Sequence, residues 1–160
     1  MSATLSEVGI RLLDPRLPGW GFPRWGSALA AGLDLHACLD APLDLAPQAP
    51  PALIPAGVSV LIRDADWCGL VLPRSGLGHR EGLVLGNGTG VIDADYEGPL
   101  MISAWNRNPA GVPIRIAPGE RIAQLVFSRV ARPRLALLDA GSAGFGSARG
   151  GGGFGSSGRT

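Results

Sequence analysis

The chain has 160 residues, with 14 basic and 13 acidic side chains and a formal net charge of +1, so it lacks the strongly basic surface that duplex nucleic acid demands. All the basic side chains counted there are arginine, which excludes a Walker A phosphate loop because that loop needs its lysine. No stretch reaches the ~18 apolar residues of a membrane span, and we expect one soluble, cytoplasmic domain with neither nucleic acid nor membrane as a partner.

Short apolar runs bounded by Pro and Gly follow one another every eight to twelve residues. This spacing predicts an all-β sandwich or barrel rather than parallel βαβ units, without an amphipathic helix of any length. The strands are expected at residues 8–13, 33–39, 58–62, 69–72, 101–105, 112–116 and 122–130. Asp34 lies between Leu33 and Leu35 in the second run, and the default expectation for it is a half-solvated position on the other face of the strand.

The two cysteines, Cys38 and Cys68, are far apart in sequence and each has apolar neighbours. Free buried thiols in a reducing compartment are the simpler interpretation. His36 and His79 share no ligand spacing, which argues against a metal held by Cys or His.

The stretch "PRSGLG" at residues 73–78 follows a predicted strand and is compatible with a single helical turn. Its free N–H groups, together with the Arg74 fork and the Ser75 hydroxyl, would suit a phosphate group. Further along, "PGER" at residues 118–121 predicts a tight turn ahead of a strand. In that strand Gln124 alternates with apolar residues, so it could also belong to the wet face of an edge strand.

The segment "LGNGTGVIDADYEG" at residues 85–98 lies between two apolar runs and reads as two strands joined by a turn. If it is extended, Asp93 and Asp95 share one face and Tyr96 lies on the other. Acids near a turn are often merely solvated. Asn87 and its glycine neighbours, however, expose backbone donors and acceptors that suit a flat polar edge such as a nucleobase, with Tyr96 as an apolar floor.

The composition changes at Asp139, because 9 of the last 22 residues are Gly and 4 are Ser. Such a segment cannot bury enough surface to offset its ordering entropy. We therefore divide the chain into a β domain, residues 1–138, and a flexible arm, residues 139–160. The arm is either a plain flexible terminus or a segment that orders only over a ligand.

Five segments occur in a specific order: "AGLDL", "PRSGLG", "GNGTGVIDADYEG", "GERIAQLVF" and "RGGGGFGSSG". As a set, they resemble the ordered motifs of the trimeric deoxyuridine triphosphatase (dUTPase) family. The resemblance implies a distorted jelly roll of the β-clip type, a homotrimer with shared active sites, and a C-terminal arm that closes over the site. It also implies a dUTP diphosphatase that converts dUTP to dUMP and pyrophosphate by in-line attack of water on the α-phosphorus, which limits uracil in DNA and supplies dUMP for dTMP synthesis.

The resemblance further implies roles for individual residues. Asp93 matches the general base, and Mg²⁺ is expected on the substrate phosphates, with Asp34 acting on it through water. Arg149 is expected on the γ-phosphate and Phe154 over the uracil. The full set of implied substrate-binding residues is Arg74, Ser75, Gly76, Asn87, Gly90, Val91, Tyr96, Met101, Gln124, Arg149, Phe154, Gly155 and Ser156.

Two alternatives stay open at this point. The dCTP deaminase branch shares the implied fold, but its chemistry needs a carboxylic acid on the strand after the hairpin, where "GPLMISAWN" at residues 98–106 offers only Ser103. A regulator that binds the nucleotide without turning it over is the second alternative.

Overall fold

The computed structural model describes residues 4–142, 144 and 146, and within them β-strands dominate. The elements in chain order are β1 (Gly9–Leu12), η1 (Leu17–Trp20), β2 (Leu33–His36), β3 (Leu43–Leu45), β4 (Ala52–Pro55), β5 (Val58–Leu61), β6 (Trp67–Pro73), α1 (Ser75–Arg80), β7 (Leu83–Leu85), β8 (Gly90–Ile92), β9 (Met101–Asn106), β10 (Ile114–Ile116) and β11 (Arg121–Arg129). Neither helix in this part of the chain has the length and apolarity needed to cross a bilayer.

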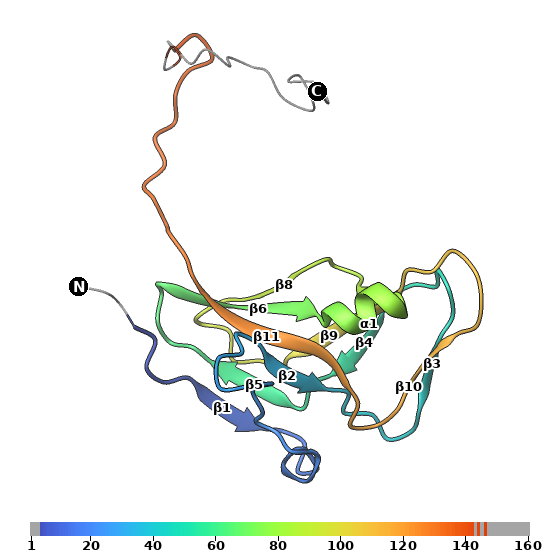
Figure 1. The fold of residues 1–160 in the computed structure, drawn as a ribbon. Coiled ribbons are helices and arrows are strands. Elements are labelled where there is room, and N and C mark those ends of the chain that lie inside the picture. Colours follow the sequence, from blue (N-terminus) through green and yellow to red (C-terminus); the bar gives the residue numbers. More distant parts are fainter. Residues whose placement is uncertain (1–3, 143, 145, 147–160) are drawn as a thin grey trace.

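Antiparallel pairing joins the strands into small sheets that wrap around one core (Figure 1). The strand orders are β2-β11-β6-β8, β4-β9-β7, β1-β5 and β10-β3. The all-β prediction is therefore confirmed, and each predicted run contains a strand. β3 and β4 lie outside the predicted runs, because both are short and belong to the Pro-rich stretch "APLDLAPQAPPALIP", where prolines argue against a strand.

The segment at residues 85–98 is not the plain hairpin that the apolar runs predict. Its flanking strands β7 and β9 do pair, with Leu83 opposite Asn106. Between them, however, the chain crosses to the other large sheet, where β8 pairs with β6 and places Gly90 opposite Val71. Gly88 has φ +72°, a conformation that glycine adopts without steric cost, so the tight turn before β8 depends on it.

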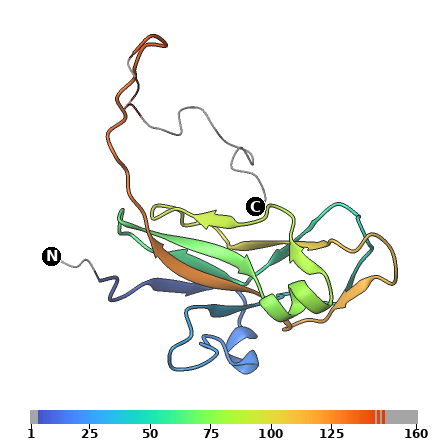
Figure 2. The same ribbon diagram turned by 45° about the horizontal axis from the view of Figure 1, so that its top comes forward.

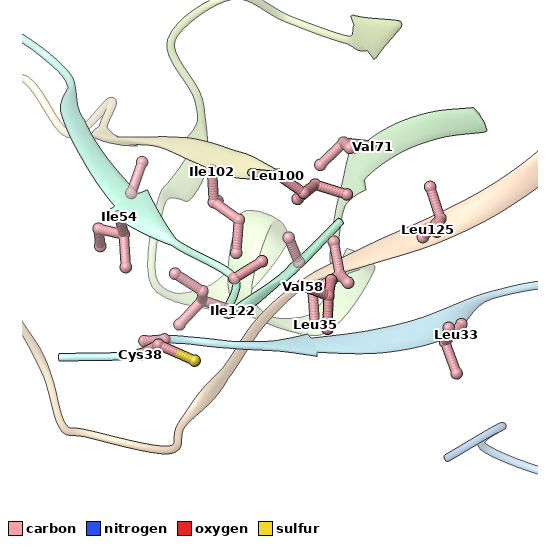
Figure 3. Packing of buried hydrophobic residues seen from close by; sticks show 14 of the residues in the cluster. Leu33, Leu35, Cys38, Ile54, Val58, Val71, Leu100, Ile102, Ile122 and Leu125 are labelled. Carbon is pink, nitrogen blue, oxygen red and sulfur yellow. The ribbon is translucent and has the colours of Figure 1, made fainter. Parts of the chain in front are cut away.

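The inward faces of the sheets meet in one apolar core (Figure 3). Ile54 of β4, Ile102 of β9 and Leu125 of β11 are fully buried there. The prediction of buried free thiols is confirmed, since Cys38 and Cys68 are both buried and unbonded. This packing fixes the strands that carry the two pockets described below.

A polar cluster joins the loop after β1 to the segment that follows β2. The Asp14 carboxylate is buried and accepts hydrogen bonds from Arg16 Nε at 2.9 Å and Arg16 Nη2 at 2.6 Å. Arg16 also donates to the Leu39 carbonyl at 3.0 Å and lies 5.1 Å from the centre of the Trp20 ring. The hydrogen bonds from Arg16 lower the pKa of Asp14 to about 2, although burial opposes this effect.

This lowered pKa predicts a pH-dependent part of the stability. The folded-state pKa of Asp14 lies below its ordinary value of 3.8, so ionised Asp14 stabilises the fold above that value and the contribution is lost as the pH falls toward 2. We expect Asp14→Asn to remove a pH-dependent part of about 2 kcal/mol from the free energy of unfolding at pH 6. Measured by urea unfolding, the gap between wild type and variant should shrink by more than half at ~pH 2.5. A gap that stays constant over this range would contradict the assignment.

Candidate active site

The larger of two relevant pockets is rich in arginine. It has a volume of about 620 Å³ and lies where β2, β11 and the start of α1 meet. We call it the arginine pocket, after Arg74, Arg80 and Arg121 in its lining. Among the described residues that line it, Asp34 is the single acidic one.

Asp34 holds two of these arginines in place. Its Oδ1 lies 3.3 Å from Arg74 Nε, and its Oδ2 accepts a hydrogen bond of 2.8 Å from Arg121 Nη1. Arg74 Nη1 in turn donates to the Arg121 carbonyl at 2.9 Å, so the three residues form one network. Asp34 is only 7% exposed, which corrects the expectation of a half-solvated strand residue. The reason is that Arg121 of the neighbouring strand β11 and Arg74, which follows β6, supply guanidinium partners for the buried charge.

Gln124 also faces the arginine pocket. It lies on β11, which has β2 on one side and β6 on the other, so the edge-strand interpretation is wrong. Its Nε2 donates to the Pro73 carbonyl at 3.1 Å, which leaves the second N–H of the same amide available. A side chain at Gly32 would displace the Gln124 amide from its present position.

The predicted helical turn after β6 is confirmed as α1, which begins at Ser75. Arg74 precedes it in an extended conformation and provides no side-chain cap. Ser75 is exposed, and Gly76 lines the same cavity as Arg74. The structure therefore brings Arg74, Ser75, Gly76 and Gln124 together, as the resemblance implies.

The second pocket lies along β8 and the segment that follows it, and we call it the hairpin pocket. Its volume is about 260 Å³. Six of the implied site residues line it, namely Asn87, Gly90, Val91, Asp93, Tyr96 and Met101. The Tyr96 hydroxyl donates to the Pro99 carbonyl at 3.0 Å and so fixes the ring at the pocket wall.

Asp93 and Asp95 do not share a face. The Tyr96 amide donates to the Asp93 carbonyl at 3.1 Å, so the chain turns after β8 instead of staying extended. Asp93 consequently lines the hairpin pocket, whereas Asp95 lines a different hollow with Arg63 and Arg132. The prediction of a common face fails because it assumed a strand where the chain forms a turn.

The two pockets lie at different levels along β6. Ile92 at the end of β8 pairs with Gly69, near the start of β6, while Arg74 follows the end of β6. Arg74 is five residues beyond Gly69, so a rise of ~3.3 Å per residue places it roughly 17 Å along the strand from the level of Ile92. In Figure 2, β6 runs toward α1 and β8 runs away from it. The pockets share no lining residue among those described.

Sequence reasoning missed Arg80 and Arg121. Arg121 belongs to the "GERIAQLVF" segment, but its role depends on the β2-β11 register, which a single sequence does not reveal. Arg80 follows Gly76 by four residues on α1, a spacing that places both on one helix face once the helix is known. The remaining implied residues, Arg149, Phe154, Gly155 and Ser156, lie outside the described residues.

A magnesium ion would find no dense cluster of protein ligands here. Within residues 4–142, no group of three or more His, Cys, Asp or Glu side chains is placed to hold a metal. Both carboxylate oxygens of Asp34 already face arginine nitrogens. Asp34 therefore does not fit the role of a direct ligand, and the oxygen ligands that Mg²⁺ prefers would have to come mainly from water and a bound phosphate chain.

Comparison with known proteins gives consistent matches over nearly the whole chain. The dUTPase family profile matches residues 20–158. A deoxyuridine 5'-triphosphate nucleotidohydrolase of Xanthomonas oryzae pv. oryzae is 48% identical over 99% of both chains, and one of Xanthomonas campestris pv. campestris is 50% identical over 95% of this chain and 97% of its own.

Solved structures agree with these relatives. The dUTPase of Staphylococcus bacteriophage 80alpha with dUpNHpp is similar, with a TM-score of 0.77, 31% identity, and coverage of 96% of this chain and 99% of that chain. A mutant dUTPase of phage phi11 of S. aureus, described with a structural Mg(II) ion, has a TM-score of 0.69 and 25% identity, over 84% of this chain and 97% of that chain.

The Asp34 network predicts that replacing Asp34 by Asn lowers the free energy of unfolding more than the same replacement at Asp44. Asp34→Asn leaves two partly buried guanidinium groups without their shared charge, so we expect a loss of about 1 to 3 kcal/mol in the free energy of unfolding. The matched control is Asp44→Asn, because Asp44 pairs with Arg115 at an exposed position. There we expect a loss of at most ~1 kcal/mol. Urea unfolding at one protein concentration measures both, and equal losses would contradict the role given to Asp34.

Proposed function

The chain belongs to the dUTPase family, and we propose that it hydrolyses dUTP to dUMP and pyrophosphate by attack of water on the α-phosphorus. The observation that carries this proposal is the hairpin pocket, in which Asn87, Asp93 and Tyr96 line one small cavity. The reaction limits uracil incorporation into DNA and supplies dUMP for dTMP synthesis. Both described cysteines are free thiols, which supports a reducing compartment such as the cytoplasm.

The hairpin pocket supplies recognition of the pyrimidine. Asn87 and the neighbouring backbone groups offer donors and acceptors to the polar edge of uracil. The pocket is small, at about 260 Å³, and its walls include Val71 and Val91, which favours uracil over a purine or a 5-methylated base. The Tyr96 ring, fixed by Pro99, packs beneath the deoxyribose and opposes a 2′-hydroxyl.

Asp93 is the proposed general base. Its side chain follows β8 and lines the same cavity as Asn87 and Tyr96, so a nucleoside held there brings its α-phosphorus near the carboxylate. The carboxylate accepts a proton from the attacking water and holds that water in line with the bond to the leaving pyrophosphate. Such proton transfer and positioning contribute about 10²- to 10⁴-fold to a rate.

The register of β8 on β6 supports binding of the phosphates in the arginine pocket of another subunit. Gly90, at the base-recognition end, is level with Val71, while Asp93 follows the end of β8 that lies farther from Arg74. A nucleotide with its base near Gly90 and its α-phosphorus near Asp93 therefore points its phosphates away from Arg74 of the same chain. This supports a homotrimer in which the arginine pocket of one subunit serves the hairpin pocket of another.

We propose Mg²⁺ as the cofactor, bound mainly by phosphate oxygens and water. When bound, it neutralises phosphate charge. Asp34 could reach it only through water, since both oxygens of its carboxylate contact Arg74 and Arg121. The role of the arm, with Arg149 on the γ-phosphate, Phe154 over uracil and contacts from Gly155 and Ser156, stays a prediction, as does the domain boundary after residue 138.

Two alternatives receive less support. Deamination of dCTP needs an acid on the strand after the hairpin, and β9 carries none between Met101 and Asn106. A regulator without turnover would not need a carboxylate in the base pocket, yet Asp93 lines it.

Substrate selectivity tests the proposed reaction first. We expect pyrophosphate release from dUTP to exceed that from dTTP, dCTP and UTP by at least about 100-fold in kcat/KM, because each competitor loses or clashes with a contact in the hairpin pocket. A coupled pyrophosphate assay measures all four. Ammonia release from dCTP, or binding of dUTP without pyrophosphate release, would support one of the alternatives instead.

The Asp93 assignment has a matched control in Asp95, which is two residues away and lines a different hollow. We expect Asp93→Asn to lower kcat by about 10²- to 10⁴-fold, because an amide cannot accept the proton, while Asp95→Asn keeps kcat within about threefold. Affinity for dUpNHpp should change little in either variant. An Asp93→Asn enzyme that retains most of its rate would show that another group is the base.

A further inference from the structure

The arginine pocket has an imbalance of charge. Its described lining carries three arginines, Arg74, Arg80 and Arg121, against the single carboxylate of Asp34, a net charge of +2. His36, which is paired with Arg121 on β11, adds no charge because burial lowers its pKa. The excess charge belongs to a cavity of about 620 Å³, a size that suits a polyanion.

The three arginines are not equivalent. Arg74 and Arg121 both contact Asp34, which fixes their orientation and offsets part of their charge. Arg80 forms no ion pair with any carboxylate of the described chain. It is also the most C-terminal residue of α1, and its side chain is exposed at the pocket.

The Arg80 guanidinium lies close to Gly76. A Cβ atom on Gly76 would lie 3.0 Å from Arg80 Nη2 and 3.5 Å from Arg80 Cζ. The guanidinium therefore folds back along the helix by one turn and lies against Gly76, which itself lines the pocket. This arrangement presents a planar fork to the cavity, a geometry that suits phosphate oxygens.

From this arrangement we propose that Arg80 is a substrate-binding residue that recognises the phosphates beyond the cleaved bond, so that it separates dUTP from dUMP. The proposal rests on the proposed function, since it concerns the same substrate. Arg74 and Arg121 form a fixed, partly neutralised wall of the pocket, and Arg80 supplies the uncompensated charge. The pyrophosphate portion of dUTP carries most of the charge of the nucleotide, and dUMP lacks it.

The affinities of the protein for dUpNHpp and for dUMP, measured by calorimetry, test this role. For Arg80→Gln we expect the affinity for dUpNHpp to fall about tenfold or more, the size of one charge-assisted hydrogen bond, while the affinity for dUMP stays within twofold. Arg80→Lys should lose about threefold or more for dUpNHpp, because an ammonium cannot form the planar fork. The control Arg129→Gln removes an exposed arginine at the other end of β11 and should leave both affinities unchanged.

The outcomes separate this proposal from the function on which it rests. Suppose that the wild-type protein hydrolyses dUTP. If Arg80→Gln then loses affinity for dUpNHpp and for dUMP by the same factor, only the role of Arg80 is overturned. A dUpNHpp affinity within threefold of wild type would overturn it as well. If Arg80→Gln does not fold, the affinities of Arg80→Lys for dUpNHpp and dUMP are compared instead, and equal losses of affinity for the two ligands overturn the role of Arg80. Absence of dUTP hydrolysis in the wild type would instead overturn the proposed function.

Discussion

The pairing of β8 with β6 is the constraint on which the functional arrangement depends. It places Gly90 opposite Val71, two residues before the end of β6, carries Asp93 toward the start of that strand, and leaves Arg74 beyond its end. In the proposed pose, the nucleotide therefore runs from its base to its α-phosphorus away from the arginines of the same chain. A strand pairing, rather than any single side chain, supports the proposal that the site is shared between subunits.

The buried carboxylate of Asp34 is the second constraint. A charge removed from water is costly unless it is paired, and here the pairs are Arg74 and Arg121. The arginines lose conformational freedom before any ligand arrives, which reduces the entropy cost of binding phosphate. Arg80, whose guanidinium lies near Gly76 and forms no ion pair within the described residues, complements this fixed wall. The pocket thus combines two arginines that Asp34 orients with one arginine that has no ion pair within the described residues.

The sequence predicted the residues of the pockets better than the path of the chain between them. Asp93, Tyr96 and Asn87 are grouped within ten residues, so a local reading found them. The crossing of β8 to the other sheet was missed, because two apolar runs with a glycine-rich link are also typical of a plain hairpin. Arg121 was missed for a related reason: its contact with Asp34 joins strands 87 residues apart, and a single sequence contains no register. Burial of Asp34 depended on the same long-range contact.

The most direct test of a site shared between subunits is a crystal structure of this protein with dUpNHpp. We expect uracil in the hairpin pocket of one subunit, a water between Asp93 and the α-phosphorus, and the remaining phosphates in the arginine pocket of another subunit. A nucleotide bound entirely within one chain, or an Asp93 carboxylate turned away from the α-phosphorus, would contradict it.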